Sequence, residues 1–166
     1  MKSFAFVLIV LAACGPGVKG GPTINSRVGA QPYQAPKSNS IISEDILARE
    51  PVANTAVVKH ILISWADLAE AFGGRQDERS AKRTMKDAET EVTSIMAQLK
   101  GGGDFDVIMR EKSEDAGSAK SGAPFTVKPD SGLVIEFRQL SLRLNPGEYG
   151  VCQSDFGFHI IKRYPD

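Results

Sequence analysis

The sequence has few of the residues on which metal sites and disulfide scaffolds depend, since its 166 residues include only two His and two Cys. These stand at positions 14, 60, 152 and 159, a spacing that fits none of the paired patterns of tetrahedral metal sites. Two cysteines are also too few for a disulfide-stabilised small domain. The formal net charge is zero, because twenty Lys and Arg balance twenty Asp and Glu. Nucleic-acid-binding domains, in contrast, usually carry a clustered basic excess. We therefore expect one globular domain that holds no metal and binds no nucleic acid.

The N-terminus has the pattern of a targeting segment that is removed from the mature chain. Lys2 supplies a positive charge, residues 4–13 form an apolar run, and small residues stand directly before Cys14. Ten apolar residues are too few to cross a hydrocarbon core of about 30 Å, so residues 1–13 are predicted to be a signal peptide. The segment resembles the lipobox of bacterial lipoproteins, which implies that Cys14 is lipidated. The alternative is a signal peptide followed by an incidental cysteine.

Lipidation would attach the chain to a membrane of the bacterial cell envelope, because several acyl chains anchor more tightly than one. Gly15 replaces the Asp that retains lipoproteins at the inner membrane, which favours the outer membrane.

Residues 14–54 are predicted to be the lipidated cysteine and a flexible tether. They are rich in Gly, Pro, Ser and Asn and show no sustained periodicity, so they bury too little apolar surface to fold. A short docking helix is an option for their last part, at Ile41, Ile42, Ile46 and Leu47. The folded domain is therefore expected to span residues 55–166.

The remaining sequence indicates an α+β fold. Residues 56–64 are apolar and β-branched apart from Lys59 and His60, as in a buried strand. Apolar residues at helical spacing predict helices in four places, over residues 65–72, 85–99, 104–109 and 133–144. Two further strands are predicted near residues 147–154 and 158–164, and between 113 and 132 the sequence is polar and turn-rich. In this order of elements, the first and last strands can pair at the centre of one sheet.

Several motifs of this domain closely resemble parvulin-type peptidyl-prolyl isomerases, in matching order over residues 57–163. The motifs are KHILI at 59–63, SEDAGSAK at 113–120, Phe137, PGE at 146–148 and FGFHIIK at 156–162. The resemblance implies a small antiparallel sheet of about four strands surrounded by about four helices. It also implies a monomeric isomerase that acts on Xaa-Pro bonds of cell-envelope proteins, assists their folding and needs no cofactor. A non-catalytic parvulin-like chaperone that binds unfolded or Pro-containing segments is the alternative.

By the same resemblance, four residues form the catalytic group: His60, Asp115, Ser154 and His159. The family has two hydrogen-bonded histidines on adjacent central strands, next to a Cys or Asp beside the twisting amide and a Thr or Ser. Considered alone, each histidine is a satisfied core residue and Asp115 is a turn residue or helix cap. The strand before Ser154 is one residue shorter than the family pattern.

Three apolar residues are expected to hold the proline ring of the substrate, namely Phe125, Leu133 and Phe137. Their alternative role is ordinary core packing. Residues 121–125 read SGAPF, where many parvulins have a Gly-Gly-Asp-Leu-Gly turn.

A basic insertion follows the first strand and contains Arg75, Arg79, Lys82 and Arg83. Phospho-directed parvulins bind phosphate with such a loop, and a preference for Glu or Asp before proline is a milder version of the same function. A solvated loop is the alternative, because Asp77 and Glu78 dilute the positive charge. Cys152 is interpreted as a small buried hydrophobic residue, against a reactive thiol near the active site.

Overall fold

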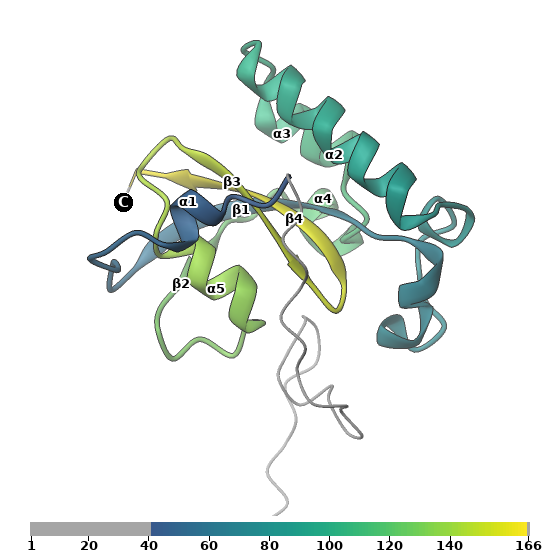
Figure 1. Ribbon diagram of the computed structural model, residues 1–166, viewed down its shortest axis with the longest axis horizontal. Helices are drawn as coiled ribbons and strands as arrows, with labels where there is room; N and C mark the ends of the chain where they lie inside the picture. The colour runs from purple at the N-terminus through teal and green to yellow at the C-terminus, as the bar shows by residue number, and fades with distance from the viewer. Residues whose placement is uncertain (1–40, 166) are drawn as a thin grey trace, which may run out of the picture.

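The computed structural model describes residues 41–165 (Figure 1). The predicted signal peptide, Cys14 and residues 15–40 of the predicted tether lie outside the described residues. The elements follow in the order α1 (Glu44–Leu47), β1 (Ala56–Ile63), η2 (Ala66–Phe72), η3 (Ser80–Lys82), α2 (Met85–Lys100), α3 (Phe105–Lys112), α4 (Ala116–Ser121), β2 (Phe125–Val127), α5 (Ile135–Ser141), β3 (Tyr149–Ser154) and β4 (Gly157–Tyr164). In the described part of the chain, no helix has the length and apolar character needed to cross a membrane.

Four strands form one antiparallel sheet in the order β2-β1-β4-β3. The N-terminal strand β1 and the C-terminal strand β4 therefore pair at the centre, as the sequence predicts. In their register His60 lies opposite Ile161 and Leu62 lies opposite His159. Cys152 of β3 lies opposite His159 on its other side. Because paired residues of neighbouring strands point to the same face, His60, His159 and Cys152 share one face of the sheet.

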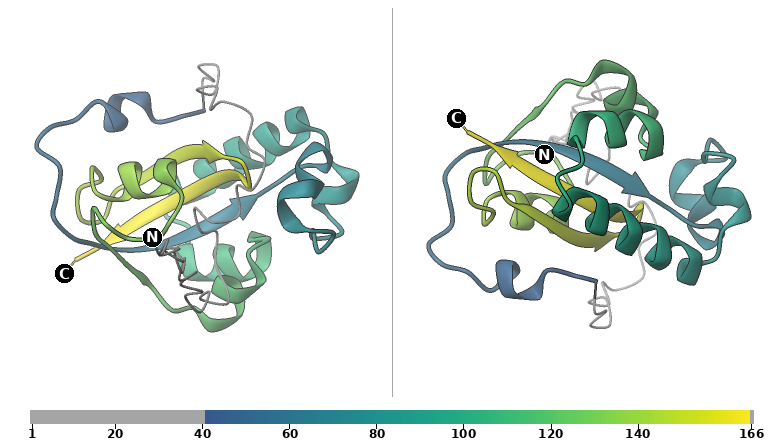
Figure 2. Two further views of the ribbon diagram at one scale, coloured as in Figure 1. Left: turned by 90° about the horizontal axis from the view of Figure 1, so that it is seen from below. Right: turned by 90° about the horizontal axis from the view of Figure 1, so that it is seen from above.

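Helices α2 and α3 lie on one face of the sheet and α5 lies on the other (Figures 1 and 2). Each face has its own apolar core. The α2 side buries Ile61, Ile63, Phe158 and Ile160 against the stripe Ala88, Val92, Ile95 and Leu99 and against Phe105, Ile108 and Met109. The α5 side buries Val58, Cys152 and Ile161 against Phe137, Leu140 and Leu144.

Local signals in the sequence fix where the two helices on the α2 side begin. The Thr84 side chain accepts a hydrogen bond from the Asp87 N–H, and the Asp87 carboxylate accepts one from the Thr84 N–H, which is a capping box. Asp104 caps α3, as predicted, by accepting a hydrogen bond from the Val107 N–H at 3.0 Å.

The structure differs from the sequence-based expectation in three places. Residues 41–54 pack against the domain, because the Ser43 N–H donates to the Val151 carbonyl at 2.9 Å and Ile46 of α1 is buried. The folded part thus reaches back at least to residue 41, earlier than the expected start at residue 55. The segment 113–132, expected to be polar and turn-rich, contains α4 and β2. The helix expected over residues 133–144 is shorter, because α5 spans only Ile135–Ser141 and Leu133 lies before it.

Candidate active site

Two buried histidines lie side by side at the centre of the sheet. His60 comes from β1 and His159 from β4, and their Nδ1 atoms are 3.2 Å apart. Their side chains are 3% and 1% exposed, respectively. The sequence thus correctly placed the two residues on adjacent central strands and next to each other.

Asp115 connects the histidine pair to the N-terminus of α4. Its Oδ2 atom accepts a hydrogen bond from His60 Nε2 at 2.9 Å and another from the Ser118 hydroxyl. Its Oδ1 atom accepts the Gly117 N–H at 3.1 Å, which caps α4. Asp115 therefore makes the contacts expected of a helix cap and also those expected of a residue next to the histidine pair.

Ser154 completes the group from the end of β3. Its hydroxyl lies 2.8 Å from His159 Nε2 and accepts the Phe156 N–H at 3.1 Å. The turn that follows is tight, because Gly157 has a φ of 127° and a Cβ atom there would lie 2.5 Å from the Ile63 carbonyl oxygen. Only glycine fits this position, so the end of β1 and the β3–β4 turn are held close together beside the histidines.

The hydrogen bonds of the four predicted residues connect them in the order Asp115, His60, His159 and Ser154. Burial alone would raise the pKa of the Asp115 carboxyl, but hydrogen bonds from His60 and Ser118 outweigh it and hold that pKa well below its usual range. Burial, together with the neighbouring His60, lowers the pKa of His159 to about 3, so its imidazole is neutral. Because an ionised carboxylate only accepts, His60 Nε2 is the donor in its bond with Asp115. The two Nδ1 atoms share one hydrogen bond, and His159 Nε2 is hydrogen-bonded to the Ser154 hydroxyl at the far end.

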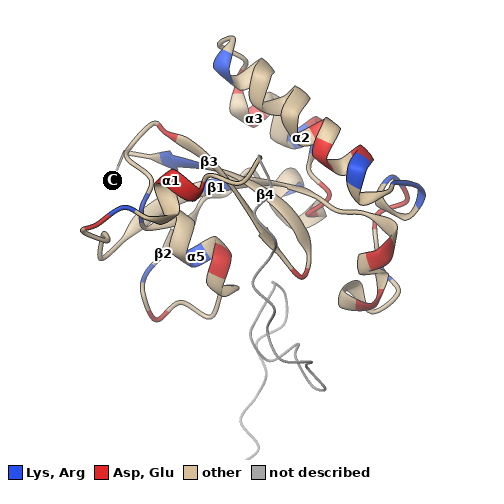
Figure 3. Ribbon diagram, viewed as in Figure 1, with Lys and Arg blue, Asp and Glu red and all other residues tan. Residues whose placement is uncertain are grey.

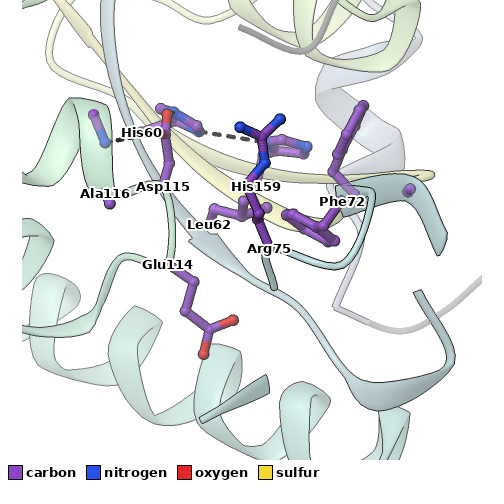
Figure 4. Close-up of a pocket in the computed structure, with 11 residues that line it drawn as sticks. His60, Leu62, Phe72, Arg75, Glu114, Asp115, Ala116 and His159 are labelled. Atoms are coloured by element: carbon purple, nitrogen blue, oxygen red, sulfur yellow. Dashed lines mark hydrogen bonds and ion pairs between the residues drawn. The ribbon is translucent and has the colours of Figure 1, made fainter. Parts of the chain in front are cut away.

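A cavity of about 530 Å³ opens next to these hydrogen-bonded residues (Figure 4). The histidines and Leu62 line it together with residues of the insertion, of the segment before α4, of the first turn of α4 and of the β3–β4 turn. These residues are Ala71, Phe72, Arg75, Glu114, Asp115, Ala116, Gly117 and Phe156. Phe72 and Phe156 meet edge to face with ring centroids 5.6 Å apart. Both residues were missed by the sequence analysis, which assigned Phe72 to the apolar face of a short helix.

Of the three predicted proline-binding residues, Phe125 and Phe137 contact the histidines. The ring of His60 makes edge contacts with Phe137 at 5.1 Å and with Phe125 at 5.5 Å between centroids. Phe137 is buried, whereas Phe125 and Leu133 are half-buried at the margin of the α5-side core. The three residues therefore belong to the α5-side core or its margin, and none of them is among the residues that line the cavity.

The four cations of the insertion do not converge on one point. Arg79 binds Asp77 and backbone carbonyls at the end of α3, and Arg83 binds the Glu114 carboxylate at 2.6 Å. Lys82 is exposed and does not line the cavity. Only Arg75 lines the cavity, and within residues 41–165 its guanidinium makes no hydrogen bond or ion pair. Acidic and basic residues are mixed around the insertion (Figure 3).

Cys152 lies in the α5-side core and is 1% exposed. Burial, together with the nearby Glu136, raises the pKa of its thiol far above the usual range. The thiol therefore stays protonated and matches the interpretation as a small buried hydrophobic residue.

The chain belongs to the family of PPIC-type PPIase domains, whose model matches residues 45–164. It is similar to the foldase protein PrsA of Oceanobacillus iheyensis, with 30% identity over 108 residues that make up 64% of this chain and 36% of that protein. It is also similar to foldase protein PrsA 4 of Bacillus cereus, with 33% identity over 129 residues that make up 76% of this chain and 45% of that protein. The chain therefore spans less than half the length of either relative.

The solved structure of TbPIN1 has a similar fold, with a TM-score of 0.57 and 22% identity over 68% of this chain and 98% of that chain. Together with the family match, it confirms the predicted parvulin-type α+β domain with its four-stranded antiparallel sheet.

Proposed function

We propose that this protein catalyses the cis/trans isomerisation of Xaa-Pro bonds in proteins of the bacterial cell envelope and so assists their folding. The observation that carries the proposal is the hydrogen-bonded series Ser154, His159, His60 and Asp115, which borders the cavity and contacts the rings of Phe125 and Phe137. Burial of these polar groups is costly unless each is hydrogen-bonded, and the presence of both histidines with Asp115 at the cavity favours an enzyme over a domain that only binds unfolded segments.

The proposed mechanism depends on the loss of amide resonance during rotation. The planar Xaa-Pro bond is separated from its isomer by a barrier of about 18–20 kcal/mol, and an enzyme lowers it by binding the twisted amide more tightly than either planar form. Phe125, Leu133 and Phe137 hold the proline ring in a place from which water is excluded, while the preceding carbonyl group rotates. The twisted amide is less polar than the planar one. A partly desolvated site therefore destabilises the twisted amide less than it destabilises the planar amide.

Asp115 acts on the charge of the rotating carbonyl group. The carbonyl oxygen loses negative charge when resonance with nitrogen is lost, so an ionised carboxylate beside it repels the planar amide more than the twisted one. His60 and Ser118 keep the carboxylate ionised and fixed, and His159 and Ser154 fix the orientation of the His60 ring. The chemistry requires no covalent step and no cofactor.

A protease-coupled assay on Xaa-Pro peptides tests the proposal with wild type, His60→Ala and Asp115→Ala. We expect a clear rate above background for wild type and a loss of about 100-fold in kcat/KM for Asp115→Ala. Asp45→Ala is the matched control, because the Asp45 side chain lies on α1 and is 79% exposed. If micromolar wild-type protein adds nothing to the background rate, the enzyme function is wrong and the non-catalytic chaperone function takes its place.

The residue before proline is proposed to be preferentially Glu or Asp. Arg75 is the support, since it lines the cavity with a guanidinium that has no partner among residues 41–165, whereas Arg79 and Arg83 bind groups elsewhere. A single guanidinium suits a carboxylate better than a doubly charged phosphate. We expect Arg75→Gln to reduce the ratio of Glu-Pro to Leu-Pro turnover by about two- to fivefold, and Lys86→Gln, whose side chain is 85% exposed on α2, to leave it unchanged. Slower turnover of Glu-Pro than of Leu-Pro by wild type contradicts this preference.

Attachment to the membrane through a lipid on Cys14 is part of the same proposal, with the outer membrane favoured by Gly15. A monomer tethered in this way would meet envelope proteins as they fold. Cys14→Ser should move the protein from the membrane fraction to the soluble fraction of the envelope. An unchanged membrane fraction contradicts the lipid anchor and leaves the isomerase proposal standing.

A further inference from the structure

The segment Ser113–Asp115 joins α3 to α4 and carries the acidic end of the proposed catalytic chain. It runs beside β1 without belonging to the sheet. The Leu62 N–H donates to the Ser113 hydroxyl at 3.1 Å, and the Glu114 N–H donates to the Leu62 carbonyl at 2.9 Å. The Ser64 N–H donates to the Glu114 carboxylate at 2.7 Å. These bonds hold one side of the segment against the strand that contains His60.

The basic insertion holds the other side of the segment through Arg79. The Arg79 guanidinium donates to the carbonyls of Glu111, Lys112 and Ser113 at 3.0, 3.3 and 3.1 Å. These groups end α3, where unpaired carbonyls carry partial negative charge, so a cation is favourable there. The same guanidinium also donates two hydrogen bonds of 3.0 Å to the Asp77 carboxylate, which holds it in place. Arg79 therefore links the insertion to the two residues directly before Glu114 and to the end of α3.

Arg83 makes the second link, to the residue next to Asp115. Its guanidinium donates to the Glu114 carboxylate at 2.6 Å and to the Ser64 carbonyl at 3.1 Å. The Glu114 side chain is 1% exposed and points away from the histidines (Figure 4). Burial raises the pKa of Glu114, and the hydrogen bonds from Ser64 and Arg83 oppose that rise. A buried carboxylate of this kind keeps its position only while its partners are in place.

We propose that Arg79 and Arg83 are positioning residues, which clamp the segment Ser113–Asp115 so that the Asp115 carboxylate stays in contact with His60 and Ser118. The two cations of the insertion therefore act on the reaction through Asp115 and do not bind an anion of the substrate. This inference rests on the proposed isomerase function for its kinetic consequence, whereas its structural consequence can be measured without turnover.

Arg79→Met is the most informative variant, because the Arg79 side chain is 43% exposed and its loss leaves no buried charge unpaired. We expect kcat to fall about tenfold or more, since small misplacements of catalytic groups have effects of this size, while KM changes less than twofold. Arg79→Lys keeps the charge but lacks the planar guanidinium, so we expect it to recover only part of kcat. Lys86→Met, in the neighbouring helix α2, is the matched control and should behave as wild type.

The readout that does not depend on turnover is the 15N chemical shift of His60 Nε2, which responds to its hydrogen bond with Asp115. In Arg79→Met this shift should move towards its value in Asp115→Ala, and in Lys86→Met it should not move. If Arg83→Met does not fold, the double variant Arg83→Met/Glu114→Gln removes both charges and should show the same displacement of the His60 signal.

The outcomes separate the clamp from the isomerase proposal. If wild type catalyses isomerisation and both Arg79→Met and the double variant keep its kcat and its His60 signal, the clamp is wrong. If wild type shows no activity but the His60 signal moves as described, the isomerase function is wrong and the clamp holds as a structural device.

Discussion

The two faces of the sheet differ in what their buried residues do. The α2 side buries an apolar cluster around Ile61, Phe158 and Ile160, whereas the α5 side buries His60 and His159 within an apolar core. The same two strands, β1 and β4, supply both faces, because alternate residues of a strand point in opposite directions. The residues of β1 and β4 that face the α2 side thus provide mainly packing, and the alternate residues, which face the α5 side, include the proposed catalytic histidines.

The polar residues of the α5 side are tolerated because they form hydrogen bonds with one another. Both ring nitrogens of each histidine have partners, and the chain ends at Asp115, which reaches the cavity. Unpaired, these groups would each cost free energy on burial. The comparison therefore teaches that mutations on the α2 side should affect mainly stability, and mutations on the α5 side should affect stability and activity together.

The largest expected effect on stability is on the α2 side. Phe158 is fully buried between the sheet and the helices, and Phe158→Ala should lower the free energy of unfolding by about 3–5 kcal/mol. The protein that remains folded should keep the kcat of wild type. Urea unfolding and the isomerisation assay, performed on the same samples, measure both quantities. Val107→Ala, at a side chain that is 43% exposed, is the control and should change neither.

The next effect is a pH dependence that belongs to the α5 side. His159 has a pKa of about 3 in the folded state and about 6.5 when unfolded. Between these values the unfolded chain binds a proton that the folded chain does not, so the free energy of unfolding should fall as the pH falls below about 6.5, by about 1.4 kcal/mol per pH unit. Urea unfolding from pH 7 to pH 4 measures the slope, and His159→Gln should remove it. An identical slope in this variant would show that His159 is not the group responsible.

A smaller effect is expected at the end of the hydrogen-bonded chain. Ser154→Ala removes the hydrogen-bond partner of His159 Nε2, and a buried polar group left without a partner costs about 1–3 kcal/mol. We expect the free energy of unfolding and kcat to decrease together, because the His159 ring is no longer held by this bond. Ser154→Thr keeps the hydroxyl and should recover both. A variant with normal stability and activity would exclude Ser154 from the chain.

The smallest effect returns to the α2 side. Thr84 caps α2 through the hydrogen bond from the Asp87 N–H, and Thr84→Ala should lower the free energy of unfolding by about 1 kcal/mol. No change in kcat is expected, because the cap lies outside the proposed catalytic chain. Thr84→Ser keeps the cap and serves as the control in thermal and urea unfolding. A reduced kcat in Thr84→Ala would mean that α2 is coupled to the site more closely than the comparison of the two faces suggests.

The features that the sequence could predict are those with a local pattern or a family motif. The β-branched apolar run around His60 predicted its strand, the family motifs placed both histidines on adjacent central strands, and the spacing of apolar residues located α2. The short elements α4 and β2 were missed, because six and three residues are too few for a periodic signal. α1 was anticipated as a docking helix, but the extent of its packing was not, since Ser43 bonds to Val151, far along the chain.

The roles of Arg79 and Arg83 could not be predicted for the same reason. Their partners lie about thirty residues away, at Glu111–Glu114, so only the folded chain brings them together. The sequence gives a count of charges in the insertion, whereas the structure assigns two of these charges to internal contacts and leaves Arg75 at the cavity. The contact of Phe72 with Phe156 could not be predicted either, because the two residues are far apart in the sequence.

The most direct test of the central claim is exchange NMR at equilibrium on an Xaa-Pro peptide, with no protease present. The proposed function predicts that catalytic amounts of wild type increase the rate of cis/trans interconversion and leave the cis fraction unchanged, since a catalyst does not shift an equilibrium. Asp115→Ala should lose most of the increase and Asp45→Ala should retain it. A cis fraction that changes in proportion to added protein, with no increase in rate, would show a binding module and would contradict the account.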